Sequence, residues 1–160
     1  MTLTSPAIAA PSEIDASRQE PPLLPAGRFD DLLALARTLL DMPMAAVIAA
    51  STDRHAVIAQ QGLEAGCTPL ARDHLFVRCW EQHAPLLVLP ALPGSPRCPI
   101  RAHVGIALQD AQGRRIGLLA VCDRQPRARP SDAQLQSLEQ LGRLATSLLQ
   151  QEAVARHSTI

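Results

Sequence analysis

Alternating apolar positions flank the short connection 110–113 on both sides: Val104, Ile106 and Leu108 before it, and Ile116, Leu118, Ala120 and Cys122 after it. A repeat of two residues is typical of β-strands, because successive side chains point to opposite faces of a sheet. Two such stretches joined by a polar loop that contains Gly form a hairpin. We therefore predict a β-hairpin over residues 104–122.

Two other stretches have the periodicity of amphipathic helices. An apolar stripe from Phe29 to Leu40 predicts the first helix, which Pro43 ends. The second helix follows a capping box formed by Ser131 and Gln134. We expect it to run for about 20 residues, along a stripe made of Leu135, Leu138, Leu141, Leu144, Ala145, Leu148 and Leu149.

The segment between these helices carries further strand signals. The apolar run 44–50 and the shorter run 55–60, joined by the polar residues 51–54, predict a first hairpin. Residues 73–83 can form a short helix, and a proline precedes an apolar strand at 86–89. The order helix, two strands, helix, strand, hairpin, helix predicts an α+β domain with an antiparallel sheet flanked by helices.

The chain of 160 residues, 47% of them apolar, has the size and composition of one globular domain. Residues 1–27 contain five prolines and no sustained periodicity, so we expect a disordered leader. The domain is predicted over residues 28–152 and a flexible tail over 153–160. Prolines at every third position from Pro90 to Pro99 favour a rigid surface loop.

Charge and hydropathy exclude several classes of partner. The formal net charge is zero and the arginines are dispersed, so we predict no nucleic-acid partner. No apolar run reaches the roughly 18 to 20 residues of a membrane span, and the N-terminus lacks a basic signal-peptide region. We expect a cytoplasmic protein with no membrane partner, whose four cysteines are thiols.

The closing hairpin resembles the last strands of GAF domains, where the pattern "G-x-P-L/A-L…D-G-x-x-I-G-x-L-x-V-x-D…P-R" precedes a long C-terminal helix. The matching residues are Gly105, Ala107, Leu108, Gly113, Ile116, Gly117, Leu119, Val121, Asp123, Pro126 and Arg127, and Gly62-Leu63 resembles the end of the second strand. The resemblance covers roughly residues 29–151. It implies a GAF/PAS-like sheet whose N- and C-terminal helices pack together.

GAF domains bind small ligands between the sheet and the region that corresponds here to residues 72–100. The candidate ligand-binding residues are Phe76, Cys79, Trp80, His83, Arg97, Cys98 and His103. Arg97 or Arg101 would suit an anionic ligand, whereas Phe76 and Trp80 could equally pack in the core. The chain has no Asn or Lys for a cyclic-nucleotide signature, and its Cys79 is followed by Trp80 where bilin-binding relatives usually have His. The cofactor stays unknown.

One catalytic branch of the GAF family reduces free methionine-(R)-sulfoxide with cysteines in this central region and acids on the last strand. Cys67, Cys79 and Cys98 occupy comparable places. Two features depart from that branch: residues 73–78 replace its Gly-rich segment, and Ala120 and Cys122 stand at the acid positions. Asp123 should face the other side of the sheet.

A metal or haem is a further alternative, because Cys79 and His83 are four residues apart on the expected helix, with His74 before them and Cys98 and His103 after them. The spacing of the other candidates fixes no geometry, so no metal site and no catalytic residue are assigned.

The preferred interpretation is a stand-alone, non-catalytic sensory or regulatory GAF domain that binds a small cytosolic ligand or a signalling protein. The alternatives are the thiol reductase and a degenerate GAF module for dimerisation or scaffolding, with its pocket filled. The leucines of 135–149 exceed what one sheet face buries, so we also predict a homodimer through the N- and C-terminal helices.

Overall fold

The computed structural model describes residues 27–50, 55–63, 86–89, 92 and 99–158. The described elements are α2 (Asp30–Leu40), β1 (Met44–Ala50), β2 (His55–Gln61), β3 (Leu86–Leu89), β4 (Ala102–Gln109), β5 (Arg115–Asp123) and α4 (Asp132–Ser158). The strands form one sheet in the order β2-β1-β5-β4-β3, and every neighbouring pair is antiparallel. This confirms the predicted α+β class and both predicted hairpins.

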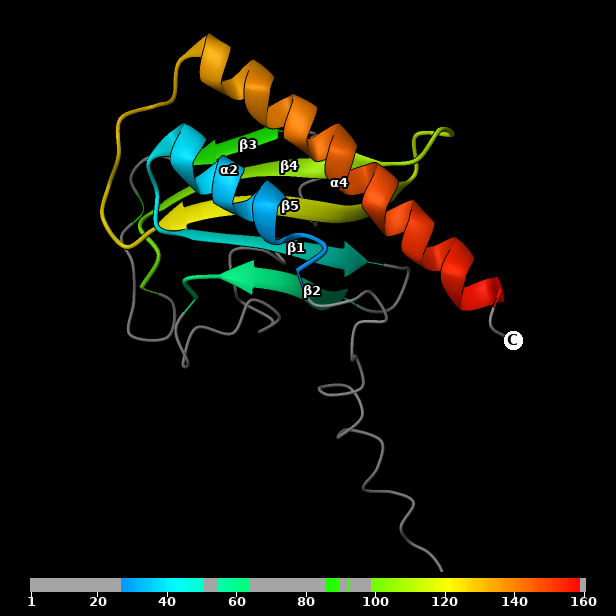
Figure 1. Cartoon of the computed structure of the whole chain (residues 1–160). Coiled ribbons are helices and arrows are strands. Elements are labelled where there is room, and N and C mark those ends of the chain that lie inside the picture. The colour runs from blue at the N-terminus through cyan, green and yellow to red at the C-terminus, as the bar shows by residue number, and fades with distance from the viewer. Residues whose placement is uncertain (1–26, 51–54, 64–85, 90–91, 93–98, 159–160) are drawn as a thin grey trace, which may run out of the picture.

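Helices α2 and α4 lie side by side on the same face of the sheet (Figure 1). The expected packing of the N- and C-terminal helices is therefore confirmed. A polar contact joins them, because the side-chain amide of Gln134 at the start of α4 donates to the carbonyl of Leu39 at the end of α2, at 3.0 Å. The expected helix over 73–83 and most of the proline-rich loop lie outside the described residues.

Sequence features set both ends of α2. Asp30 and Asp31 occupy its first turn, where carboxylates interact favourably with the positive end of the helix dipole. At the other end Asp41 has left-handed backbone angles, with φ 56°. The N–H of Met42 then donates to the carbonyl of Arg37 at 3.1 Å, which satisfies an end carbonyl of the helix. Pro43 follows and prevents continuation.

The predicted capping box opens α4. The backbone N–H of Gln134 donates to the hydroxyl of Ser131 at 3.1 Å, and the N–H of Ser131 donates to the Gln134 side-chain oxygen at 2.8 Å. The helix has 27 residues and so continues further than the expected length of about 20. Residues 150–158 contain neither Gly nor Pro, so nothing in them ends the helix.

The sheet has two buried faces, which we call the helix face and the distal face. The helix face packs under α2 and α4 and includes Ala45, Val47, Ala102, Val104, Ile106, Leu108, Leu119 and Val121. The distal face has its own apolar cluster, which includes Met44, Ala46, Ile48, Ile100, Leu118, Ala120 and Cys122. The two adjacent central strands β1 and β5 therefore contribute to two cores.

The two alternating sets that predicted the β4–β5 hairpin lie on opposite faces. Val104 and Ile106 pair with Val121 and Leu119 on the helix face, whereas Leu118, Ala120 and Cys122 belong to the distal face. The register shifts between Leu108 and Gln109, and this bulge leaves Ile116 with the helix-face cluster.

The β4–β5 turn is held by one carboxylate. Asp110 accepts the backbone N–H groups of Gln112 and Arg114, each at 2.9 Å, and the Nε of Arg114 at 2.9 Å. These bonds, above all the one from the backbone of Arg114, lower the pKa of Asp110 below its usual value. Gly113 completes the turn with φ +81°.

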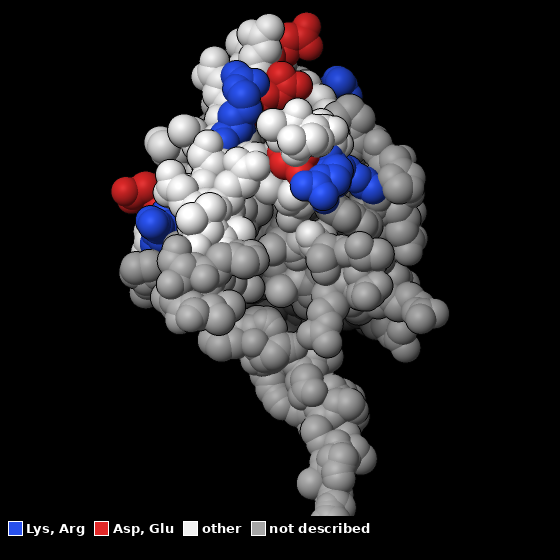
Figure 2. Space-filling model, turned by 90° about the vertical axis from the view of Figure 1, so that its right-hand side faces the viewer, with Lys and Arg blue, Asp and Glu red and all other residues white. Residues whose placement is uncertain are grey.

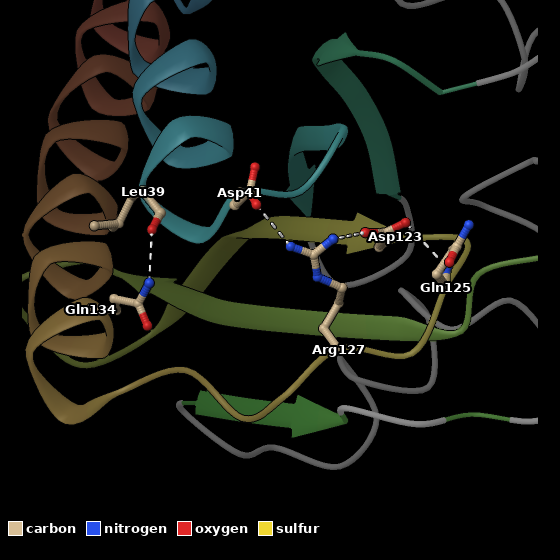
Figure 3. Close-up of polar contacts among 6 residues, drawn as sticks. All are labelled: Leu39, Asp41, Asp123, Gln125, Arg127 and Gln134. Atoms are coloured by element: carbon tan, nitrogen blue, oxygen red, sulfur yellow. Dashed lines mark hydrogen bonds and ion pairs between the residues drawn. The ribbon is translucent and has the colours of Figure 1, made fainter.

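An arginine connects the end of β5 to the end of α2 (Figure 3). Arg127 donates from Nη1 to Asp123 at 2.9 Å and from Nη2 to Asp41 at 3.1 Å. The side chain of Asp123 is only 7% exposed, whereas that of Asp41 is 95% exposed. Asp123 also accepts the backbone N–H of Gln125 at 3.1 Å. The nearly buried carboxylate of Asp123 is thus paired with Arg127.

Among the turn glycines that the structure describes, Gly62 is expected to tolerate substitution least. Its φ is +80°, and a Cβ there would overlap the carbonyl oxygen of Pro43. We predict that Gly62→Ala lowers the free energy of unfolding by about 2 kcal/mol or more. Gly113→Ala is the control, because φ is also positive there but the space around it is open; it should cost about 1 kcal/mol. Urea unfolding measures both, and equal losses would contradict the prediction.

The Arg127 contacts should differ in their contributions to stability. Arg127→Gln removes the partner of the nearly buried Asp123 carboxylate, so we expect a loss of about 1 to 3 kcal/mol in the free energy of unfolding. Asp41→Asn removes only an exposed pair and keeps a residue that tolerates left-handed angles, so its cost should stay below about 0.5 kcal/mol. Chemical denaturation in low salt compares them. A loss in Asp41→Asn as large as that in Arg127→Gln would refute this assignment.

Candidate functional site

The distal face is built from rows of residues that lie directly opposite one another on neighbouring strands. The first row, which we call the His103 row, crosses four strands in the order Leu89, His103, Cys122 and Met44. Opposed residues share a face of the sheet. The side chains of His103, Cys122 and Met44 are 0%, 1% and 3% exposed. One imidazole and two sulfur atoms therefore lie in the interior on the same side of the sheet.

The next row has very small residues on the three central strands, and we call this part of it the small-residue floor. It places Gly105, Ala120 and Ala46 opposite one another on β4, β5 and β1. Ala120 and Ala46 are fully buried. A third row, with Ala107, Leu118 and Ile48, is apolar. The central part of the distal face thus combines a low apolar surface with a single imidazole.

Gly105 lets the imidazole lie beside the floor. A Cβ on Gly105 would be 2.6 Å from Cε1 of His103 and 3.2 Å from Nε2. Such distances are too short for non-bonded atoms, so any side chain at position 105 would displace the ring. A neutral imidazole carries one hydrogen-bond donor and one acceptor.

Of the seven candidate ligand-binding residues, His103 is the one that the described part of the chain contains. Arg101, considered for an anionic ligand, is also described; it is exposed, and its Nε donates to the carbonyl of Leu92 at 3.1 Å. The structure places it on the distal face of β4, with a buried side chain. The other candidates, Phe76, Cys79, Trp80, His83, Arg97 and Cys98, lie outside the described residues and stay predictions.

Sequence reasoning did not single out the neighbours of His103. Met44 and Ala46 carry no chemical signature of their own, and Ala120 and Cys122 stand out in the sequence only as the positions where the reductase branch has acids. Their grouping depends on which residue pairs with which across β1, β5 and β4. The alternation predicted a hairpin, but the β1–β5 pairing joins segments that are distant in the sequence.

The last strand places Ala120 and Cys122 on one face of the sheet and Asp123 on the other. Ala120 and Cys122 lie on the distal face. Asp123 is the next residue along the strand and is bonded to Arg127 and, through Arg127, to the end of α2 (Figure 3). The expectation that Asp123 faces away from Ala120 and Cys122 is therefore confirmed. Within the described residues, no group of three His, Cys, Asp or Glu side chains has the proximity to hold a metal ion.

A separate groove of about 440 Å³ lies beside the end of α2. Its lining is Ala34, Arg37, Thr38, Asp41, Met42 and Pro43. The guanidinium of Arg37 donates to the Gln61 side chain at 2.9 Å, and Gln61 in turn donates to the carbonyl of Asp30 at 3.0 Å. Arg37 thereby ties α2 to the end of β2, which is a structural role.

Charges on the surface are mixed in sign. On the face that Figure 2 shows, the coloured Arg side chains lie close to Asp and Glu side chains. At the β4–β5 turn this is the ion pair of Arg114 with Asp110 at 2.9 Å. The described helices include none with the length and apolar character to cross a membrane.

No protein-family model and no curated protein sequence matches this chain. Solved structures do. The GAF domain of an Acinetobacter phosphoenolpyruvate-protein phosphotransferase aligns with 81% of this chain and 84% of its own, at 13% identity and a TM-score of 0.64. The GAF domain of a putative sensor histidine kinase from Pseudomonas syringae aligns with 78% of this chain and 75% of its own, at 16% identity and a TM-score of 0.55.

A third similar structure is the blue-light-absorbing form of the PixJ GAF domain from Thermosynechococcus elongatus. It aligns with 82% of this chain and 88% of its own, at 15% identity and a TM-score of 0.59. Identities this low carry information on the fold alone. Together with the sheet order and the paired helices, these alignments establish that the chain has the fold of a GAF domain.

Proposed function

We propose that this protein is a non-catalytic sensory domain that binds a small molecule over the distal face of its sheet, in the cytoplasm. The observation that carries the proposal is the buried imidazole of His103 next to a floor of Gly105, Ala120 and Ala46. A floor without large side chains gives a ligand room, and one polar group in apolar surroundings gives it orientation.

The similar structures support a role in signalling. Two of them are GAF domains of a sensor histidine kinase and of the photoreceptor PixJ. A bilin is not part of the proposal, because Cys79 is followed by Trp80 and the chain contains no Tyr. What transfers is the use of this fold as a sensor, with the signal passed to a protein partner.

The distal face defines the chemistry of the proposed ligand. The residues that β1, β4 and β5 place in the three rows include no carboxylate, guanidinium or ammonium group. A charged ligand would lose its hydration there without a compensating partner. We therefore propose a small molecule whose part over these three rows is mostly apolar and uncharged and hydrogen-bonds His103. Phe76, Cys79, Trp80, His83, Arg97 and Cys98 are proposed to complete its surroundings.

A native mass spectrum of the untagged protein from its expression host tests the proposal. We expect extra mass that disappears on denaturation. Ala120→Leu raises the small-residue floor and should reduce the bound fraction to about a tenth or less, since the ligand would have to displace a buried side chain. His103→Gln, which keeps a donor and an acceptor, should weaken binding less. Ala34→Leu is the matched control, because Ala34 is exposed on α2.

Each outcome of this experiment separates the alternatives. Extra mass retained in Ala120→Leu, with an unchanged circular dichroism spectrum, would place the ligand elsewhere. A wild-type protein without extra mass would overturn the sensor proposal and favour the dimerisation or scaffold module.

We further propose that the partner of α4 is a second copy of the chain. A stripe of uncharged residues spaced by three and four runs along α4: Ser137, Gln140, Leu144, Ser147, Gln151 and Val154. Leu144 and Val154 are 57% and 65% exposed, and Leu35 on α2 is 57% exposed. The stripe lies on the side of α4 opposite the buried residues Leu138, Ala145 and Leu149. A spacing that alternates between three and four residues is typical of the contact face of two paired helices.

The dimer proposal predicts a position-dependent effect of charge. Leu144→Glu introduces a carboxylate into the stripe and should raise the dimer dissociation constant at least tenfold, which corresponds to about 1.4 kcal/mol. Gln150→Glu adds the same charge on another exposed side of α4 and should change it little. Sedimentation velocity over a concentration series measures both variants. A wild-type protein that stays monomeric throughout would rule the dimer out.

A further inference from the structure

We propose that Met44, Cys122 and His103 form a binding site for a single Cu(I) ion on the distal face. The small organic ligand proposed for the distal face does not require a metal, so the ligand proposal and the copper proposal are tested independently. The inference starts from the His103 row, in which the thiol of Cys122 lies between a thioether on β1 and an imidazole on β4.

Strand pairing brings the three donor side chains within reach of one point. Met44 and His103 are each directly opposite Cys122, on its two neighbouring strands. Side chains opposed in this way have Cβ atoms about 4.5 to 5.5 Å apart. The sulfur and nitrogen atoms extend beyond the Cβ atoms, and the proposed site requires all three to turn toward an ion above Cys122. The His103 ring at present lies beside Gly105.

The type of donor selects the metal. Thiolate and thioether sulfur are soft ligands that favour Cu(I), and imidazole suits copper as well. A thioether is not among the usual ligands of Zn²⁺, which takes thiolate, imidazole and carboxylate. No carboxylate stands in the His103 row, so hard cations such as Mg²⁺ and Ca²⁺ find no oxygen ligands there.

Charge balance also favours a monovalent ion. On binding, the thiol of Cys122 releases its proton to the solvent and forms a Cu–S bond as a thiolate. One thiolate, one neutral thioether and one neutral imidazole with Cu⁺ give a complex without net charge. A divalent ion would leave a positive charge in a row whose three donors are at most 3% exposed. Burying that charge without a partner is costly.

The position of the imidazole depends on Gly105. A Cβ there would come within 2.6 Å of the His103 ring, so Gly105→Ala should turn the ring away from its present place. This substitution changes none of the donors. It therefore tests whether the orientation of His103, and not only its presence, contributes to metal binding.

Anaerobic titration of the full-length protein with Cu(I), in competition with the chromogenic chelator bicinchoninate, tests the proposal. We expect one tightly bound ion per chain in a variant that keeps Cys122 alone, with Cys67, Cys79 and Cys98 changed to Ser. Adding Cys122→Ser should abolish binding. In the otherwise wild-type chain, Met44→Leu should weaken the Cys122 site about tenfold or more, because it removes one of the three donors, and changes even in the groups around the ligands typically cost about 10- to 100-fold.

Met42→Leu is the matched control for Met44→Leu. Met42 is equally buried, at 5% exposed, but belongs to the helix-face cluster, so this variant should bind Cu(I) as the wild type does. X-ray absorption at the copper edge should give both sulfur and nitrogen neighbours, with one sulfur lost in Met44→Leu.

The proposal is overturned if the variant with Cys122 alone takes up no Cu(I), or if Met44→Leu and Met42→Leu behave alike. Cu(I) uptake that persists after Cys122→Ser would also overturn the proposal. Circular dichroism of each variant establishes that the fold is kept. The native mass spectrum of metal-free protein still reports any organic ligand, so failure here leaves the sensor proposal to its own test.

Discussion

The architecture depends on a sheet whose central strands are buried on both faces. Antiparallel sheets commonly leave one face to water, and their strands then alternate between apolar and polar residues. Here β1 contributes Ala45 and Val47 to the helix face and Met44, Ala46 and Ile48 to the distal face. Both sides of this strand must therefore avoid unpaired polar groups. His103 is the exception in the rows, and this makes it informative.

Burial on both faces also determines how much the sequence reveals. The helices, strands and capping box are local features, and their positions could be predicted from periodicity, Pro43 and the Ser131–Gln134 pair. The face of the sheet on which each residue lies was harder to predict. An apolar run such as 44–50 has no polar side that would indicate which residues face solvent. The bulge beside Gln109 adds a one-residue shift that alternation does not indicate.

The candidate site was harder to predict than the fold, for a similar reason. His103 could be proposed from its chemistry and its place beside the hairpin motif. Cys122 and Met44 gain significance only through the pairing of β5 with β1, which is a property of the folded sheet. The connection from Asp123 through Arg127 to Asp41 is equally non-local, since it links the end of the last strand to a residue that precedes the first. Sequence spacing carries no signal for such contacts.

The sheet order has a consequence for how the chain folds. The β1–β2 and β4–β5 hairpins join neighbouring segments, whereas the central β1–β5 pair joins positions 44 and 122 and must close the long intervening loop. Contacts between distant segments are entropically costly to form and slow folding. The two hairpins are therefore expected to form before they dock. Met44 joins Cys122 and His103 only at that docking step, so the His103 row exists as a unit only late in folding.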